Sequence, residues 1–210
     1  SLEMRDSQGG LATAKRSPPA PARAIAIACD IPGVAVAYDS WAEPQACPTV
    51  NAMSSKQLEG CVAVITGASL GIGRSTAIAM GRAGASVVVN YRSHEEEAQQ
   101  VVDVICESGA AAIKVQADVA EQPAVEQLVE SAVAEFGRLD IAVSNAAYSE
   151  RELYYEADME GFRRTVDVTM WGAFYLMRAA SQQMIKQGEG GQITLVSSPH
   201  AFIPAPRAMA

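Results

Sequence analysis

A short glycine-rich segment is the part of this 210-residue chain whose residue spacing most clearly indicates chemistry. The segment from Thr66 to Gly73 reads TGASLGIG, between an apolar run at 61–65 and a helical pattern that stops at Gly84. A strand that turns on glycines into a helix leaves unpaired backbone N–H groups beside the positive end of the helix dipole. Such a spot suits a diphosphate, so the segment predicts a dinucleotide site; the alternative is an ordinary glycine-rich turn.

The glycines of this segment have separate expected roles. We expect Gly67 and Gly71 to allow the tight turn and the close approach of a phosphate, and Gly73 to let the helix pack closely on the sheet. The predicted cofactor-binding residues here are Thr66, Gly67, Ser69, Leu70, Gly71, Ile72 and Gly73.

The choice of dinucleotide depends on the residues that follow the second predicted strand. Tyr91, Arg92 and Ser93 come there, and no acidic residue that would accept from a ribose 2′-hydroxyl appears before Glu95. The guanidinium of Arg92 suits a 2′-phosphate, which favours NADP(H) and leaves NAD(H) possible. The alternative is a solvated arginine at a helix start. Arg74, just inside the first helix, either supports the phosphate or faces solvent.

Alternating strands and helices must position these residues. Short apolar runs predict strands at 61–66, 86–91, 112–115, 139–144 and 191–197, and helical patterns occupy 72–83, 93–108, 123–136 and 162–187. Ser93 with Glu96 predicts a capping box for the second helix. The alternation is typical of an α/β fold with a doubly wound parallel sheet, in which right-handed crossovers give the strand order 3-2-1-4-5.

Composition restricts the class of protein. A hydrophobic content of 49% is ordinary for one soluble domain. The net charge of −8 argues against a nucleic-acid or anionic-membrane partner. No apolar stretch is long enough for a membrane span, and the four cysteines have no metal-binding spacing. We therefore expect no metal site and a cytoplasmic location.

Residues 1–52 differ from the remainder. They hold six of the ten prolines and keep no helical or strand period. The apolar stretch 24–37 suggests a strand, but Asp30, Pro32 and Gly33 interrupt it. A transit peptide is disfavoured by the acidic residues. We expect 1–52 to be a disordered extension and 53–210 to be the dinucleotide-binding domain.

The Gly-x-x-x-Gly-x-Gly spacing, led by Thr66, resembles the signature of the short-chain dehydrogenase/reductase family. The resemblance runs from about residue 53 to 210. Within it, the stretches 88–93 and 197–204 look like the branch of glucose 1-dehydrogenases and 3-oxoacyl-carrier-protein reductases. The resemblance implies a Rossmann-type fold that lacks the last two strands of the family.

The resemblance also implies further cofactor contacts. Asp118 and Val119, after the third predicted strand, would flank the adenine, and Asn145, Ala146 and Ala147 would border the adenine ribose. For Asp118, a helix-capping role in the loop is the compatible alternative.

The catalytic residues that the resemblance implies are only partly present. Ser198 occupies the position of the serine that holds the substrate oxygen, with Ser197 as the alternative, and Thr169 stands where the family has an asparagine. The acid/base tyrosine belongs thirteen residues after the serine, at position 211, whereas the sequence stops at Ala210. We expect a C-terminally truncated chain that is itself inactive.

The resemblance therefore implies that the completed protein is an NADP(H)-dependent oxidoreductase that interconverts a carbonyl and an alcohol on a small molecule. It also implies a homodimer or homotetramer that forms through the 162–187 helix. A dinucleotide-binding fragment without catalysis is the alternative, and a scaffold protein that keeps only the fold is a third reading.

Overall fold

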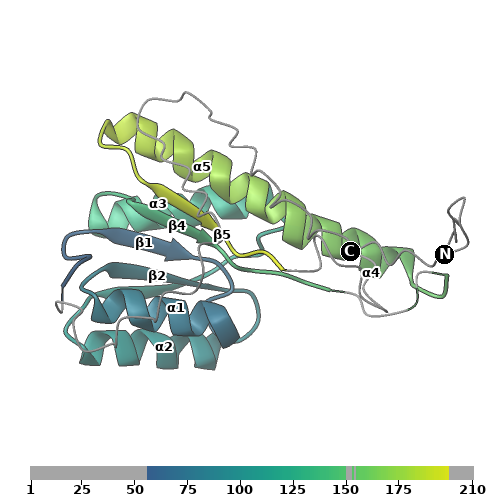
Figure 1. Ribbon diagram of the computed structural model, residues 1–210, viewed down its shortest axis with the longest axis horizontal. Helices are drawn as coiled ribbons and strands as arrows, with labels where there is room; N and C mark the ends of the chain where they lie inside the picture. The colour runs from purple at the N-terminus through teal and green to yellow at the C-terminus, as the bar shows by residue number, and fades with distance from the viewer. Residues whose placement is uncertain (1–55, 150–152, 154, 199–210) are drawn as a thin grey trace, which may run out of the picture.

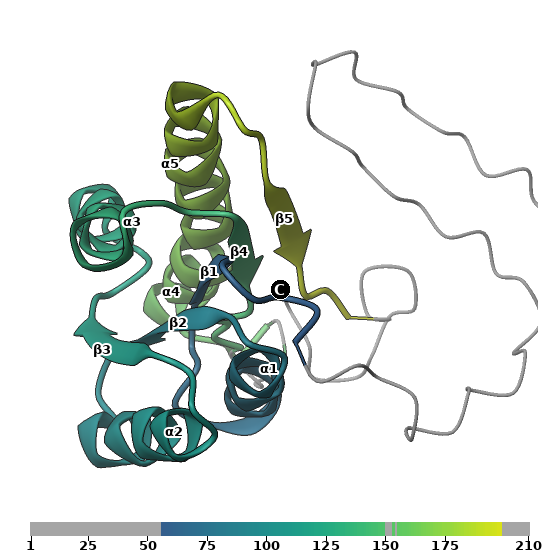
Figure 2. The same ribbon diagram turned by 90° about the vertical axis from the view of Figure 1, so that its left-hand side faces the viewer.

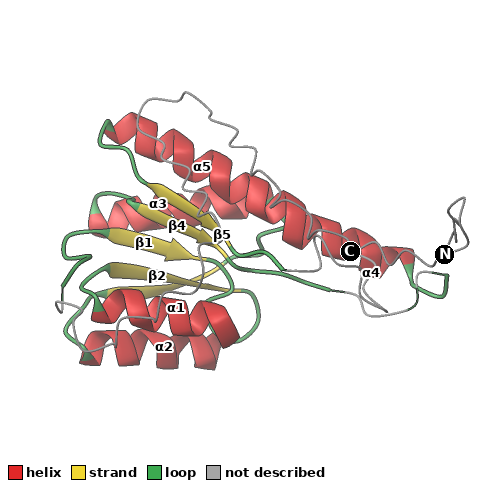
Figure 3. Ribbon diagram, in the orientation of Figure 1, coloured by secondary structure: helices red, strands yellow, loops and turns green. Residues whose placement is uncertain are grey.

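The computed structural model describes residues 56–149, 153 and 155–198, which form a five-stranded parallel sheet between two layers of helices (Figures 1 and 3). The order β3-β2-β1-β4-β5 confirms the prediction. The strands are β1 (Val62–Ile65), β2 (Ser86–Tyr91), β3 (Ala112–Gln116), β4 (Ile141–Ser144) and β5 (Gln192–Leu195). The predicted extension 1–52 lies outside the described residues.

Helices cover both faces of the sheet, α1 and α2 on one side and α3 and α5 on the other (Figure 2). Their bounds are α1 (Gly71–Arg82), α2 (Glu95–Glu107), α3 (Gln122–Phe136), α4 (Met159–Val166) and α5 (Gly172–Gln187), with a π-helical segment at Asp167–Trp171. Alternate strand residues enter opposite cores: Val62 and Val64 pack toward α3 and α5, and Ala63 and Ile65 toward α1 and α2. Burial on both faces explains the continuous apolar runs.

The long helix predicted at 162–187 differs from the expectation in two ways. It begins at Met159, because the Asp158 carboxylate caps it by accepting from the backbone N–H of Glu160 at 3.0 Å. The π-helical segment then interrupts the regular hydrogen bonding between α4 and α5. Such bulges occur frequently at functional sites. In Figure 1, α4 extends past the end of the sheet at which the strands terminate.

The capping box predicted for Ser93 is wrong. The second helix begins at Glu95, with His94 at the N-cap and no side-chain cap. The hydroxyl of Ser93 lies 3.3 Å from Nδ1 of His94, so its hydrogen bond is with a neighbouring side chain rather than with the helix.

Two findings concern only the described part of the chain. None of its helices is long and apolar enough to cross a membrane. It also contains no group of three histidine, cysteine or acidic side chains that could hold a metal ion.

Candidate functional site

The glycine loop between β1 and α1 is anchored to β4 by the buried side chain of Thr66. Its hydroxyl accepts the backbone N–H groups of Asn145 at 3.0 Å and Ala146 at 3.1 Å, and donates to the carbonyl of Val143 at 3.3 Å. Thr66 is only 1% exposed. Its hydroxyl therefore holds the glycine loop against β4 and is not available to a ligand.

Asn90, at the end of β2, anchors the same loop to β3. Its Oδ1 accepts the N–H of Gly67 at 3.1 Å, and its Nδ2 donates to the carbonyl of Ala117 at 3.0 Å. The Asn90 backbone carbonyl also accepts from Ala68 at 2.8 Å. Our sequence reasoning gave Asn90 no role. The available signal was a polar side chain at the end of a buried valine run, which must find buried partners.

The glycines allow a backbone path that side chains would block. Gly67 and Gly71 have positive φ values of +61° and +56°. A Cβ on Gly73 would overlap the carbonyl oxygen of Gly67 and the amide nitrogen of Asn145. The helix thus packs at Gly73 against the loop and Asn145, whereas we had expected the contact to be with the sheet.

The first turn of α1 has the features of an anion site. Leu70 is the N-cap residue and makes no side-chain cap hydrogen bond, and the first turn holds no acidic side chain. By contrast, α2 has three glutamates in its first turn, and α4 has both Asp158 as its cap and Glu160. Helix α3 shares both features with α1, but its N-cap residue is the acidic Glu121. The start of α1 therefore offers uncapped backbone N–H groups with no adjacent carboxylate, which suits an external anion.

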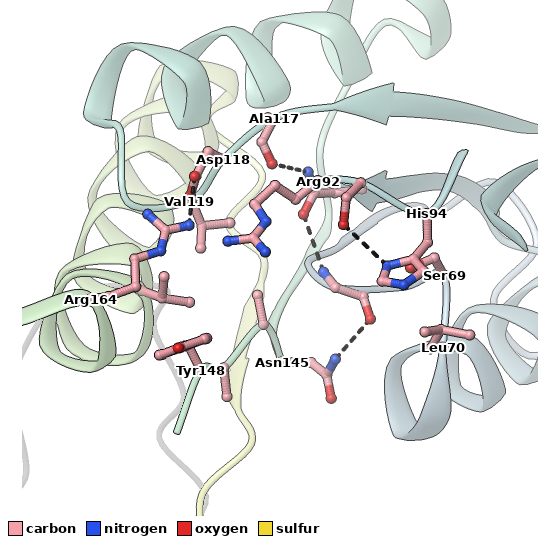
Figure 4. Close-up of a pocket in the computed structure, with 16 residues that line it drawn as sticks. Ser69, Leu70, Arg92, His94, Ala117, Asp118, Val119, Asn145, Tyr148 and Arg164 are labelled. Carbon is pink, nitrogen blue, oxygen red and sulfur yellow. Dashed lines mark hydrogen bonds and ion pairs between the residues drawn. The ribbon is translucent and has the colours of Figure 1, made fainter. Parts of the chain in front are cut away.

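A cavity of ≈ 350 Å³ lies beside this helix start, at the carboxyl ends of the strands (Figure 4). Many of the predicted cofactor residues line it together: Gly67, Ser69, Leu70, Arg92, Ser93, Asp118, Val119, Asn145, Ala146 and Ala147. Others do not line it: Thr66, Gly73 and Tyr91 are buried behind it, and Gly71 and Ile72 are exposed at the start of α1. The volume and position fit an elongated nucleotide at the end of an open parallel sheet.

The charged residues of the cavity wall are mainly cationic. Arg92 reaches into the cavity from the end of β2, and Arg164 reaches it from α4 (Figure 4). Asp118 is the single acidic residue in the described lining, and its Oδ2 accepts from Arg164 Nη2 at 2.6 Å. A cavity with two guanidinium groups and one paired carboxylate suits an anionic ligand, although the whole chain carries a net charge of −8.

Several opposing effects determine the pKa of Asp118. Desolvation raises it, but the backbone N–H of Ala120, the Arg164 guanidinium and the nearby charge of Arg92 lower it, and the net pKa lies below the ordinary value. The Ala120 N–H donates to Asp118 Oδ1 at 3.0 Å. The capping role that we considered for Asp118 is not observed, because Glu121 is the N-cap residue of α3.

Sequence reasoning missed Arg164 as part of the cavity wall. It lies 46 residues after Asp118, on a different element, and nothing local in the sequence links the two. The lining also includes Asn90, His94, Ala117, Tyr148 and Val168, which we had not predicted as cofactor residues.

The two predicted catalytic residues lie outside the cavity lining. Thr169 is in the π-helical segment, where its hydroxyl donates to the carbonyl of Tyr148 at 3.1 Å and accepts the Tyr148 N–H at 3.3 Å. Thr169 therefore holds the loop after β4 rather than a carbonyl of its own helix. Ser198 is exposed, three residues after β5 ends at Leu195. The alternative, Ser197, is exposed as well.

The ion pair between Asp118 and Arg164 gives a stability prediction. We expect Arg164→Gln to lower the free energy of unfolding by about 1 kcal/mol or less at neutral pH, because both side chains are partly exposed. The contribution is complete above the ordinary aspartate pKa and disappears as the pH falls through the lower pKa of folded Asp118. Urea unfolding of Arg164→Gln, Asp118→Asn and the double variant at several pH values measures the coupling. Purely additive effects of the two single substitutions on the free energy of unfolding at neutral pH would contradict a stabilising ion pair.

The sequence of this chain is similar to those of known dehydrogenases. The family model described as short chain dehydrogenase matches residues 61–210. L-rhamnose 1-dehydrogenase (NAD(P)(+)) from Sphingomonas sp. is 40% identical over 148 residues, which are 70% of this chain and 58% of that protein. Glucose 1-dehydrogenase 2 from Bacillus subtilis is 35% identical over 72% of this chain and 59% of its own length.

The fold is also similar to that of a solved structure. A short-chain type dehydrogenase/reductase from Mycobacterium marinum superposes with a TM-score of 0.69 and 35% sequence identity, over 72% of this chain and 61% of that chain. The sequence thus spans a little under two thirds of the length of these relatives.

Proposed function

Because this chain belongs to the short-chain dehydrogenase family, we propose that it is the dinucleotide-binding part of an NADP(H)-dependent oxidoreductase that interconverts a carbonyl and an alcohol. The related proteins are named as dehydrogenases of sugars, including one that takes NAD(P)(+). We assign this protein a small-molecule carbonyl or alcohol substrate.

One observation carries the proposal: the uncapped start of α1 and the guanidinium of Arg92 belong to one site. We assign the diphosphate to the backbone N–H groups at 69–73, since those of Gly67 and Ala68 already donate to Asn90, and the 2′-phosphate to Arg92. Asp118 and Val119 are assigned to the adenine, and Asn145, Ala146 and Ala147 to its ribose. An NAD-specific site would place a carboxylate at the end of β2, where this chain has Arg92.

The dinucleotide, when bound, supplies or accepts the hydride. We assign Ser198 to holding the substrate oxygen by a hydrogen bond, and Thr169 to positioning the Tyr148 loop. In the family, the acid/base tyrosine that donates the proton is assisted by a lysine four residues later. None of the six tyrosines has such a lysine. We place that tyrosine and lysine in sequence beyond residue 210. The alternative function is dinucleotide binding without catalysis.

A chimera tests the proposed function. The 210-residue chain would be fused to the C-terminal part of the L-rhamnose 1-dehydrogenase relative that the match leaves uncovered. We expect NADPH-dependent reduction of an aldose lactone, or NADP-dependent oxidation of an aldose, by the chimera and no turnover by the chain alone. A folded chimera that binds NADPH without turnover would favour the non-catalytic alternative.

We also propose that the completed protein forms a homodimer or homotetramer through residues 162–187. Apolar side chains on this helix are exposed, among them Met170 at 53%, Trp171 at 41% and Phe174 at 47%. Trp171 and Phe174 contact each other edge to face, with ring centroids 5.9 Å apart. Exposed apolar clusters of this kind mark interaction surfaces.

The double substitution Trp171→Ser and Phe174→Ser tests this surface. We expect it to convert an oligomeric chimera to monomers in light scattering, because buried aromatic side chains dominate interface energies. Met159→Ser is the matched control, since Met159 is 52% exposed but precedes the proposed interface. An unchanged oligomer in the double variant would refute the assignment.

The division of the chain follows the same proposal. We infer that 53–210 forms the dinucleotide-binding domain of a cytoplasmic enzyme.

A further inference from the structure

We propose that Arg164 is a positioning residue for recognition of the purine base. It holds the Asp118 carboxylate as an acceptor for the exocyclic amino group of adenine, so that the cavity selects a 6-amino over a 6-oxo purine dinucleotide. The inference rests on the proposed function, because it states which group of the base the adenine end of the cavity recognises and which distant residue makes that recognition possible.

The Asp118 carboxylate is held from two sides. Its Oδ1 accepts the backbone N–H of Ala120 at 3.0 Å, a contact within the same loop. Its Oδ2 accepts from Arg164 Nη2 at 2.6 Å, a contact from α4. One anchor alone would leave the carboxylate able to rotate about its bond to the chain. The two anchors on different oxygens fix the direction of its remaining lone pairs, and only one of these anchors is local.

These two contacts leave Asp118 able to accept from a ligand. An ionised carboxylate has about four lone-pair sites and no hydrogen to donate. The ion pair is not sealed from the cavity, because the side chains of Arg164 and Asp118 are 27% and 30% exposed and both line it (Figure 4). The cavity therefore presents an oriented group that accepts an N–H and repels an oxygen.

The wall beside this carboxylate suits the face of a planar base. Val119 and Val168 also line the cavity, and they are only 5% and 6% exposed. The start of α5 packs closely on Val119, since a Cβ on Gly172 would overlap Val119 Cγ2. A rigid apolar wall with an acceptor at its border matches a purine, whose faces are apolar and whose edge carries the polar groups.

Arg164 also gives Asp118 a partner other than Arg92. Arg92 lies close enough for its charge to act on the Asp118 carboxylate, and we assign Arg92 to the 2′-phosphate. With Arg164 removed, the carboxylate would lose its anchor on Oδ2 and could turn toward Arg92. The acceptor would then no longer be held for the base, which is why a residue 46 positions away should affect base selection.

Titrations of NADPH and of its hypoxanthine counterpart, reduced nicotinamide hypoxanthine dinucleotide phosphate, test the inference. Hypoxanthine has a carbonyl oxygen where adenine has the amino group, and both ligands carry the 2′-phosphate, so effects on the phosphate cancel in the ratio of affinities. We expect the wild-type chain to prefer NADPH about tenfold, the size of one hydrogen bond to a charged acceptor. Arg164→Gln should reduce this preference to about threefold or less, whereas Arg164→Lys, which keeps a cation for Asp118, should retain most of it.

Arg163→Gln is the matched control. Arg163 is the preceding residue of α4, is exposed and does not line the cavity, so its loss should leave the preference for adenine unchanged. An equal reduction of the preference in Arg163→Gln and Arg164→Gln would show a general effect of charge on α4 and would overturn the role of Arg164.

Asp118→Asn, alone and with Arg164→Gln, separates positioning from direct contact. The asparagine amide can donate to the 6-oxo group, so Asp118→Asn should abolish or reverse the preference, and adding Arg164→Gln should change it no further. A further change in the double variant would show that Arg164 contacts the base itself and would overturn the positioning role. An unchanged preference in Arg164→Gln would overturn it as well, while leaving NADPH binding intact. Equal affinity of the wild-type chain for NADPH and NADH would instead refute the proposed 2′-phosphate site.

Discussion

Replacing Ser198 with alanine in the catalytically complete chimera is expected to reduce kcat by about a hundredfold or more, the usual loss when one donor to a developing oxyanion is removed. Ser198 follows the end of β5, and β4 pairs with β5 in parallel register from Ile141 to Ser144. The strand thus brings the serine to the carboxyl edge of the sheet, where the cavity beside α1 also lies. The affinity for NADPH should remain unchanged, because Ser198 does not line that cavity.

Ser197→Ala is the matched control for this prediction, since it removes the same hydroxyl from the adjacent residue, which is also exposed. We expect it to retain most of the activity. Steady-state turnover with saturating NADPH gives kcat for both variants. A large loss for Ser197→Ala with little loss for Ser198→Ala would show that the assignment is displaced by one residue.

The substitution Arg92→Glu is expected to weaken NADPH binding by about tenfold to more than a hundredfold, and to leave NADH binding unchanged or improved. The guanidinium would lose a charge-assisted contact worth about 1.5–3 kcal/mol, and the new carboxylate would repel the phosphate. A carboxylate at this position can instead accept from the 2′-hydroxyl of NADH.

Arg74→Gln is the control for Arg92→Glu, because it removes another arginine near the start of α1 without placing a carboxylate in the first turn of that helix. Arg74 lies on the exposed side of α1, beside Ile78 and Arg82, and does not line the dinucleotide cavity. Fluorescence titration should show at most a small, salt-sensitive effect. Equal losses of NADPH and NADH affinity in Arg92→Glu would mean that Arg92 does not recognise the 2′-phosphate.

The parts of the fold that follow from local pattern were predictable. Strands β1, β2 and β4 are runs of mostly buried residues, and the edge strands β3 and β5 lie beside β2 and β4. Glycines mark the helix ends at Gly84, Gly137 and Gly188. The TGASLGIG segment predicted the turn because glycines adopt its positive φ values. These features depend on residues that are close together in the sequence, so the sequence alone indicates them.

What could not be predicted depends on contacts between distant elements. The Arg164–Asp118 pair joins residues 46 positions apart, and the two hydrogen bonds between Thr169 and Tyr148 span 21 positions. The π-helical segment at Asp167–Trp171 has no distinctive composition that would set it apart from an ordinary helix. Likewise, the N-cap residue of α2 is His94 rather than the predicted Ser93, and the Ser93 hydroxyl instead hydrogen-bonds the His94 ring.

The central claim is that the cavity beside α1 binds a dinucleotide and prefers one with a 2′-phosphate. Isothermal titration of NADPH and NADH into the 210-residue chain, with hydrogen exchange of each complex, tests it most directly. We predict tighter binding of NADPH than of NADH, with protection from exchange at 67–73 and 90–94 in the NADPH complex. Absence of binding by a folded chain, equal affinity for the two dinucleotides, or protection confined to other segments would contradict the account.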